Sequence, residues 1–440
     1  MKIVDKNSFS KLIRPNSTLL VGGFGCCGAP DDLLLAIRDK YETEKVPLSL
    51  NIISVSGVGN KLGMGLDLLA NKNIVNLALS GFWGFTPKLS KLALDGDIKG
   101  HNWPLGVVRQ WINSIASGND SYLSNIGMGT FIDPNVDGGR LNAKTDLLIS
   151  LITDSWGKEK LCYPIFPLDW ALMRASSSDL HGNISFENEA LLGSSINDAI
   201  AVKRFGGKVI VQVEKIVDTI DPHQVKIPGI LIDYIVLCKE GKHSPCYGNE
   251  KSFKEDSQIQ NERKELLAQK VAQTIPNNIR YINFGIGIPA LIPKYLKGKN
   301  PVTVESGVIG GIPMPDMAFG SSISPHAILD QSGIFNIYHG IGIELAILGF
   351  AEIDRTGKVN VSKFNNILKG SGGFIDIVMC AKEVILCGFS TTKSGKSKFV
   401  EKVEHITVDF SHPVFKGKKV TVITEICTYK IEHGKLIELS

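Results

Sequence analysis

A chain of 440 residues, with 43% hydrophobic and 21% charged side chains, is long enough for two or three globular domains that each bury a core. Its formal net charge of +4 is small for this length and its basic residues are scattered, which excludes the footprint of a nucleic-acid-binding protein or an anionic membrane surface. Small molecules are therefore the expected partners.

Nothing in the sequence predicts a membrane span or a targeting segment. The long apolar stretch from Ile334 to Phe350 is interrupted by Tyr338, His339 and Glu344, and no uncharged run reaches the ~18 residues that a span requires. The first residues carry charge but lack both the apolar core of a signal peptide and the Arg-rich, acid-free composition of a transit peptide. We expect a cytoplasmic protein.

The eight cysteines show no CxxC spacing, which gives no support to a zinc knuckle or a thioredoxin-like redox pair. We expect most of them to be reduced thiols. The histidines form no HExxH pattern and no acidic cluster has the spacing of a metal loop, so no metal is predicted.

Short β-branched runs alternate with longer amphipathic stretches along the chain, which is the pattern of βα units around a parallel sheet. The clearest predicted strands are, in chain order, residues 18–21, 48–53, 208–213 and 383–387. The predicted fold class is α/β.

The composition changes between about residues 239 and 264, where Lys, Glu, Asn, Gln, Ser and Gly replace most apolar side chains. Such a segment is typical of a solvated linker. We therefore predict an N-terminal domain over residues 1–240, a linker over 241–261 and a C-terminal domain over 262–440.

The two predicted domains show signs of one repeated plan. Near the start of each, an apolar strand runs into a glycine-rich turn, at residues 22–30 and 285–289, and then into a predicted apolar helix. A later turn that leads into a strand, Asp179 to Ile184, has a counterpart at Asp354 to Val359. The two pairs keep their order, although common βα-turn chemistry is an alternative explanation.

Each glycine turn exposes backbone amides at a helix start, with Pro30 or Pro289 at a first helical position, and this favours binding of an anion. Gly23, Gly25 and Gly28 match the form GxGxxG, but no acidic residue marks the end of a second strand. A close crossing of helix and strand therefore explains these glycines better than a dinucleotide site.

Glu305 follows a short apolar run, residues 301–304, and precedes a glycine-containing segment, residues 306–313. A carboxylate at a strand end, which glycines leave open to close backbone approach, suits a group that reacts covalently. The alternative is that Glu305 only caps a turn.

Taken together, these segments resemble the family I CoA-transferases. The residues that carry the resemblance are Gly22-Gly23-Phe24 with Gly28 and Pro30, Asn283 to Pro289, Val304 to Gly307, and Gly370 to Asp376. Residues 81–84, 129–134, 138–142 and 357–364 look most like the short-chain acyl-CoA:acetate CoA-transferases, of the acetate or propionate type. The resemblance covers nearly the whole chain.

This resemblance implies two related α/β domains, alpha-like and beta-like, fused in one chain as in succinyl-CoA:3-oxoacid CoA-transferase, with catalysis between them. It implies a ping-pong transfer of CoA between a short-chain acyl-CoA and a free carboxylate of the acetate, propionate, butyrate or acetoacetate class. Glu305 would be the nucleophile and would carry CoA as a glutamyl thioester. CoA is then a substrate, no resident cofactor is implied, and a homo-oligomer, dimer or tetramer, is expected.

Each tetrahedral intermediate of that reaction carries an oxyanion, which backbone amides close to Glu305 would stabilise. The residues assigned to this role are Phe284, Gly285, Gly372 and Gly373. The residues expected to face the pantetheine arm or the reacting thioester are Gly22, Gly23, Gly25 and Gly28. Tight turns and close packing are the alternative for all of these glycines. Candidates for an acyl pocket, or else for core packing, are Phe82, Trp83, Phe85 and Trp103.

Two other functions stay open at the level of the sequence. An acyl-CoA hydrolase on the same scaffold would let water attack the glutamyl thioester and would release CoA without an acceptor acid. A non-catalytic acyl-CoA or sugar-phosphate sensor is the other, and the presence of Glu305 with its glycines argues against it.

Overall fold

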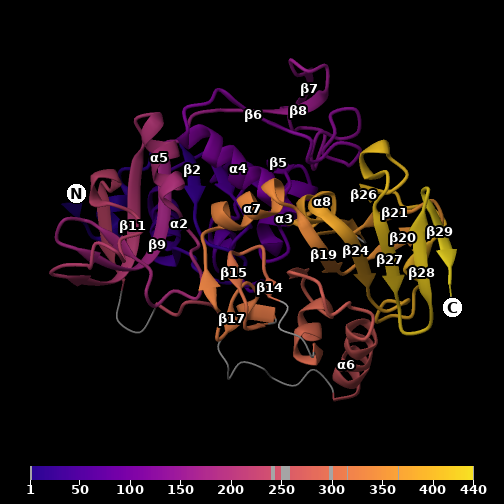
Figure 1. Cartoon of the computed structure of the whole chain (residues 1–440). Helices are drawn as coiled ribbons and strands as arrows, with labels where there is room; N and C mark the ends of the chain where they lie inside the picture. Colours follow the sequence, from indigo (N-terminus) through magenta and orange to yellow (C-terminus); the bar gives the residue numbers. More distant parts are fainter. Residues whose placement is uncertain are drawn as a thin grey trace.

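The computed structural model describes residues 2–238, 243–248, 258–296, 301–314, 316–364 and 366–439. Two large sheets dominate it, one built by the first half of the chain and one by the second. Figure 1 shows them side by side, with helices of both halves between them. No helix in the described ranges has both the length and the apolar character that crossing a membrane requires.

The first sheet holds the N-terminal half together. Its strands, in spatial order, are β1 (Lys2–Ile3), β12 (Tyr234–Leu237), β11 (Lys208–Val217), β9 (Trp170–Asp179), β2 (Thr18–Val21), β3 (Leu50–Ser54), β4 (Val75–Ser80) and β5 (Lys99–Asn102), with β10 (Ile184–Ser185) paired to β9. The helices of this half are α1 (Lys6–Ser10), α2 (Asp31–Glu44), α3 (Pro87–Leu94), α4 (Leu105–Ala116) and α5 (Ile196–Arg204).

The second sheet does the same for the C-terminal half. Its strands, in spatial order, are β18 (Ala327–Ile328), β15 (Val308–Ile309), β14 (Val302–Thr303), β13 (Ile282–Phe284), β19 (Ile343–Leu348), β24 (Ala381–Cys387), β27 (Lys419–Ile423), β28 (Thr428–Glu432) and β29 (Lys435–Glu438). Its helices are α6 (Gln258–Ala272), α7 (Gln331–Gly340) and α8 (Phe374–Cys380).

Both halves also contain smaller sheets. The first half contains a three-stranded sheet of β6 (Ser121–Ser124), β8 (Glu159–Pro164) and β7 (Ser150–Thr153), whose strand β6 contacts α4. The second carries a four-stranded sheet of β25 (Phe399–Val400), β20 (Glu352–Asp354), β21 (Lys358–Asn360) and β26 (Val408–Asp409), and the two hairpins β16–β17 (Ile312–Pro313 with Ser322–Ile323) and β22–β23 (Lys363–Phe364 with Ile367–Leu368).

The two large sheets share a parallel core with one strand order. This core is β3-β2-β9-β11-β12 in the first sheet and β14-β13-β19-β24-β27 in the second, and every neighbouring pair in it is parallel. Equivalent strands also follow one another in the same order along the chain. The predicted fold class, α/β with two related parallel-sheet-containing domains, is confirmed.

The repeat extends to single residues in the turns. The Asp179 Oδ1 atom accepts hydrogen bonds from the amides two and four residues later, at 2.9 and 2.9 Å. The Asp354 Oδ1 atom does the same in the other half, at 2.8 and 3.2 Å. Both carboxylates therefore close the same kind of turn after a strand.

The strands predicted from the sequence are present as β2, β3, β11 and β24, although β3 begins at Leu50 and β11 continues to Val217. The helix predicted after the second glycine turn differs: this segment is a 3₁₀ helix, η4 (Pro289–Tyr295), and not an α-helix. Pro293 lies inside it. A proline there has no amide hydrogen and clashes with the preceding turn of an α-helix, which explains the difference.

Helices from both halves form the layer between the sheets. Helix α4 contacts α7 and α8 (Figure 1). Buried apolar residues of both halves make one continuous cluster. Gly106 permits this close crossing, because a Cβ there would lie 2.4 Å from the Phe335 ring and 2.5 Å from Asp376. The two halves therefore share a core.

Residues 243–248, which fall within the predicted linker, pack into the first half. His243 is buried with its Nε2 3.0 Å from Glu189 Oε1, and the Tyr247 hydroxyl donates to Asp31 at 2.7 Å. The rest of the predicted linker up to residue 257 lies outside the described residues, and α6 begins at Gln258. The boundaries 1–240, 241–261 and 262–440 stay a prediction.

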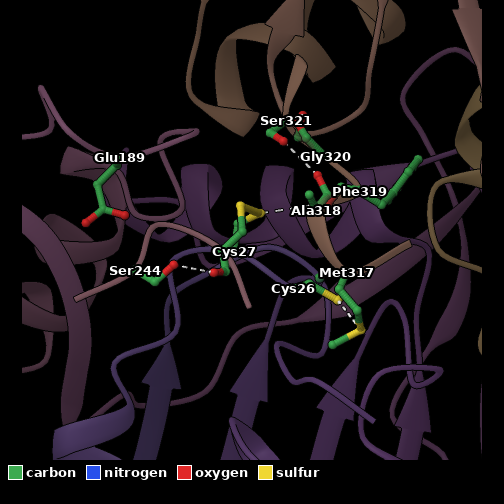
Figure 2. The surroundings of a disulfide bond; sticks show 12 residues. Cys26, Cys27, Glu189, Ser244, Met317, Ala318, Phe319, Gly320 and Ser321 are labelled. Atoms are coloured by element: carbon green, nitrogen blue, oxygen red, sulfur yellow. Dashed lines mark hydrogen bonds between the residues drawn. A yellow bond between two sulfur atoms is a disulfide. The ribbon is translucent and has the colours of Figure 1, made fainter. Parts of the chain in front are cut away.

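Cys27 and Cys246 form a disulfide, which joins the first glycine turn to this segment (Figure 2). Cys27 Sγ lies 4.0 Å from the carbonyl oxygen of Phe319, and Cys26 Sγ lies 3.8 Å from Met317 Sδ. The other six cysteines lie outside disulfides. The expectation that most of the cysteines are reduced thiols is thus confirmed, and the sequence analysis did not predict the one disulfide, whose members are 219 residues apart in sequence and meet only through the fold.

Candidate active site

Glu305 lies in the tight turn between β14 and β15. The amide of Gly307 donates to the carbonyl of Val304 at 3.0 Å, and Gly307 has a φ of 105°, which favours glycine. The Ser306 hydroxyl donates to the Gly320 carbonyl at 2.5 Å. These bonds fix the turn on both sides of Glu305 and present its carboxyl group away from the strand.

Glu305 lines a cavity of about 380 Å³ to which both halves contribute. The side chain as a whole is half-buried, but its Oε2 atom is enclosed and has no hydrogen-bond partner within the described residues. Seven phenylalanines line the walls: Phe82, Phe85, Phe284, Phe319, Phe350, Phe364 and Phe374. The carboxyl group therefore meets a largely apolar space.

Burial raises the pKa of Glu305 to about 8, with a further rise from the negative charge of Asp376 and a partial opposing effect from the nearby backbone amide of Gly373. The free carboxyl group is thus mostly protonated at neutral pH. Its ionised form lacks the solvation that a carboxylate has in water, which makes it a stronger nucleophile.

Asp376 is the charge that acts on Glu305 from the first turn of α8. It is fully buried, accepts the Gly106 amide at 3.0 Å and lies 3.0 Å from Nε2 of His339. One carboxylate therefore links α8 to α4 and α7, and it does so across the two halves.

The glycine turn before α8 runs alongside Glu305. A Cβ at Gly373 would come within 1.8 Å of Glu305 Oε2, so no other residue fits there without displacing the carboxyl group. The Gly372 amide donates to the Gly81 carbonyl at 2.8 Å, and the Leu105 amide donates to the Gly372 carbonyl at 2.9 Å. Residues of the first half thus hold in place the glycine turn of the second half that lies against the Glu305 carboxyl group.

The four residues assigned to oxyanion binding all line the cavity, but their amides are used differently. Phe284 ends β13, and the amide of Gly285 donates to the Ile347 carbonyl at 2.9 Å. The Gly372 amide is engaged by Gly81, as described above. Gly373 is therefore the assigned glycine whose backbone lies directly against the Glu305 oxygen.

The structure does not bring the N-terminal glycines to this cavity. Their amides donate to the Leu172 carbonyl (Gly22, 2.9 Å), the Gly193 carbonyl (Gly23, 2.7 Å), the Ser56 hydroxyl (Gly25, 3.1 Å) and the Pro245 carbonyl (Gly28, 3.0 Å). None of these four lines the cavity. The N-terminal glycine turn instead packs against the cavity wall: a Cβ at Gly25 would lie 3.1 Å from the ring of Phe85, which lines the cavity.

The four aromatic candidates divide into two groups. Phe82 and Phe85 line the cavity. Trp83 is buried with its indole N–H donating to the Ser80 carbonyl at 3.2 Å, and Trp103 packs edge-on against Trp111 and Tyr163 in the core. The two phenylalanines thus line the cavity, whereas the two tryptophans are core residues.

Two lysines at the cavity had no signal in the sequence. Lys61 comes from the first half and Lys369 from the second, and both line the cavity. Burial and the nearby Lys61 ammonium lower the pKa of Lys369. No local motif marks either residue, and only the packing of the halves shows that they face one space.

Ser371 and Asp376 could have been found from the sequence, because both lie inside the glycine-rich segment that carries the family resemblance. Its glycines alone were assigned a role. Within the described ranges, no group of three or more His, Cys, Asp or Glu side chains is placed to hold a metal ion.

Comparisons with known proteins show the family of this chain. The family model for coenzyme A transferase matches residues 6–237. The chain is 34% identical to acetate CoA-transferase YdiF of Escherichia coli O157:H7, over 93% of this chain and 83% of that protein. It is 31% identical to caffeate CoA-transferase of Acetobacterium woodii, over 99% of this chain and 90% of that protein.

A solved structure extends the similarity to the fold. The acyl-CoA transferase YdiF of E. coli O157:H7, as a thioester complex with CoA, superimposes with a TM-score of 0.90 and 32% sequence identity, covering 99% of this chain and 88% of that one. The resemblance read from the sequence is therefore confirmed. The chain belongs to the coenzyme A transferase family and is a CoA-transferase.

Proposed function

We propose that this CoA-transferase moves CoA between a short-chain acyl-CoA and a free carboxylate, with Glu305 as the nucleophile and a glutamyl-CoA thioester as the covalent intermediate. The observation that carries the proposal is the placement of the Glu305 carboxyl group. It lies in an apolar cavity at the meeting of the two halves, with a raised pKa and with Gly373 against one oxygen.

In the first half-reaction, the Glu305 carboxylate attacks the thioester carbonyl and CoA leaves as a thiolate, which gives an acyl-glutamyl anhydride. The thiolate then attacks the glutamyl carbonyl, forms the glutamyl-CoA thioester and releases the first acid. A second carboxylate reverses these steps. A glutamate is required because its anhydride and thioester keep the energy of the original thioester bond.

The surroundings of Glu305 favour transfer over hydrolysis. With acyl-CoA in the cavity, the phenylalanine walls would limit the access of water, which is the nucleophile that would hydrolyse the thioester. The backbone of Gly373 lies where an amide can stabilise the charge that develops on the carbonyl oxygen. The proposal needs no resident cofactor, because CoA enters and leaves as a substrate.

The preferred acid is the part of the proposal that the relatives constrain least. The names of the two similar enzymes cover acetate and caffeate, which differ greatly in size. The acid panel in the test therefore includes acetate, propionate, butyrate, acetoacetate and caffeate.

The test is intact-protein mass spectrometry after incubation with propionyl-CoA and no acceptor acid. We expect a CoA-sized adduct on the peptide that contains Glu305, which added acetate discharges with formation of acetyl-CoA. Glu305→Gln should form no adduct. Glu401→Gln, a change at an exposed glutamate, is the matched control and should behave as the wild type.

Two results would contradict the proposal. If the wild type exchanges CoA while no adduct forms on Glu305, another nucleophile acts. If CoA is released without an acceptor and no acid of the panel receives it, the protein is a hydrolase on this scaffold.

A further inference from the structure

We propose that the Ser371 hydroxyl donates a hydrogen bond to the carboxyl or thioester oxygen of the substrate beside Glu305, and that Asn102 is the positioning residue that holds Ser371 there. The inference rests on the proposed function of Glu305. It adds one side chain that contacts the substrate and one that acts through it from the other half of the chain.

Ser371 is a buried polar residue with an unused hydroxyl. It lines the cavity, is 4% exposed, and its Oγ has no partner within the described residues. Buried hydroxyl groups in folded proteins are almost always hydrogen-bonded, because leaving one without a partner costs free energy. The Oγ is enclosed in the free protein. Because Ser371 lines the cavity, rotation of its side chain toward that space would give the hydroxyl a bound acyl or carboxyl oxygen as its missing acceptor.

Ser371 is also adjacent in sequence to the glycines that lie beside the Glu305 carboxyl group. It immediately precedes Gly372 and Gly373, where an added Cβ would lie 4.0 Å from Oε1 and 1.8 Å from Oε2 of Glu305. The carbonyl group that Glu305 attacks therefore lies close in space to this turn. A hydroxyl donor at that place gains strength as the carbonyl oxygen takes on negative charge.

Asn102 holds this turn from the first half. Its side chain is fully buried, and its Nδ2 donates to the carbonyls of Ser80 at 2.9 Å and Gly81 at 2.7 Å. Its Oδ1 accepts the amide of Ser371 at 2.9 Å. Because carbonyls accept and amides donate, these partners fix the orientation of the Asn102 amide group.

Further bonds from the first half flank Ser371 on both sides. The Trp83 amide donates to the Lys369 carbonyl at 2.7 Å, and the Gly372 amide donates to the Gly81 carbonyl at 2.8 Å. The Asn102 side chain bonds both to the carbonyl of Gly81 and to the amide of Ser371, and so joins these two segments. The position of the Ser371 hydroxyl relative to Glu305 is thus set by contacts between the halves.

No bond is made or broken at Ser371 in this role. The hydroxyl keeps its proton and shares it with the substrate oxygen, most strongly when that oxygen is an oxyanion. Removing it should therefore slow the formation of the Glu305 adduct more than it weakens substrate binding.

The experiment measures adduct formation on Glu305 in a single turnover with propionyl-CoA, and kcat and KM for transfer to acetate. We expect Ser371→Ala to slow adduct formation and lower kcat about 10- to 100-fold, with a small change in KM. Ser371→Thr keeps a hydroxyl and should recover part of the loss. Ser155→Ala, at an exposed turn, is the matched control.

The role of Asn102 is tested by a double-mutant cycle. If Asn102 acts through Ser371, the variant with both Asn102→Ala and Ser371→Ala should be about as slow as the slower single variant, not slower by the product of the two effects. Multiplying effects would mean that Asn102 supports the fold and does not position Ser371. Thermal unfolding checks that each variant is folded.

Ser371→Ala decides the inference even if Asn102→Ala does not fold, because it removes only an oxygen without a partner. An unchanged rate of adduct formation in folded Ser371→Ala would overturn the inference while leaving Glu305 as the nucleophile. A wild type that forms no adduct would instead count against the proposed function itself.

Discussion

The turns after β3 and β14 are built alike, yet only one carries a carboxyl group. Ser56 and Ser306 are both buried, and each hydroxyl donates to a carbonyl, of Gly23 at 3.2 Å and of Gly320 at 2.5 Å. Each serine is followed by a glycine with positive φ, 58° in the first half and 105° in the second. The residue before the serine is Val55 in one turn and Glu305 in the other.

This difference separates what the repeated fold needs from what the chemistry needs. Val55 is 2% exposed and packs in the core, where an apolar side chain adds stability. Glu305 occupies the equivalent place with a carboxyl group whose charge is costly to bury. The scaffold is thus present twice, and the proposed nucleophile once.

The largest expected effect comes from removing the group that distinguishes the two turns. Glu305→Gln keeps the size of the side chain but is a far poorer nucleophile, so transfer of CoA should fall by roughly 10⁴-fold or more. Steady-state transfer from propionyl-CoA to acetate measures this, with Glu401→Gln as the control. Near-normal activity in Glu305→Gln would show that the carboxyl group of the second turn is not the nucleophile.

The next effect concerns the backbone that approaches only the second turn. Gly373→Ala places a Cβ 1.8 Å from the original position of Glu305 Oε2, so the carboxyl group must move. We expect kcat to fall on the order of 100-fold, as for loss of a stabilising donor. Gly340→Ala, where a Cβ meets nothing within 4 Å, is the control for a glycine change outside the cavity.

The converse change tests whether the first turn tolerates a carboxyl group. Val55→Glu should lower the free energy of unfolding by about 3 kcal/mol, because it buries a polar group without partners. It should restore no activity in the Glu305→Gln background. Val136→Glu, at a residue that is 51% exposed, is the control and should unfold at nearly the wild-type denaturant concentration.

The pH dependence of the reaction sharpens the comparison further. Because the pKa of Glu305 is raised to about 8, kcat/KM should increase with pH and reach half its maximum near pH 8. Asp376→Asn removes the negative charge that contributes to this rise and should move the midpoint to lower pH. A midpoint that does not respond to Asp376→Asn would contradict the assigned cause.

The same pKa predicts a smaller effect on stability. The folded pKa of about 8 lies above the ordinary value of 4.5, so the folded protein binds the proton more tightly than the unfolded chain. The free energy of unfolding of the wild type should therefore fall as pH rises from 4.5 to about 8, and Glu305→Gln should not show that loss. Denaturant unfolding at pH 5.5 and 8.5 measures it, and a difference between the two proteins that does not grow with pH would contradict the shift.

Some features of this protein follow from local sequence. Strands β2, β3, β11 and β24 are marked by β-branched runs, and the turns around them by glycines and prolines, because hydrophobic period and turn chemistry act over a few neighbouring residues. The α/β class was predictable for that reason, and the family was predictable from the resemblance of the glycine-rich segments to those of CoA-transferases. Glu305 was identifiable as a candidate from its strand end and the glycine after it.

Only the tertiary structure decided which groups around Glu305 are available for chemistry. The amides of Gly22, Gly23, Gly25 and Gly28 are used within the protein, and so are those of Gly285 and Gly372, whereas Gly373 lies against the carboxyl group. Lys61, Ser371 and the pair Cys27–Cys246 gain their surroundings from segments more than a hundred residues away or from the opposite half. A local pattern can show that a donor exists, but whether it is already bonded depends on the packing of the two halves.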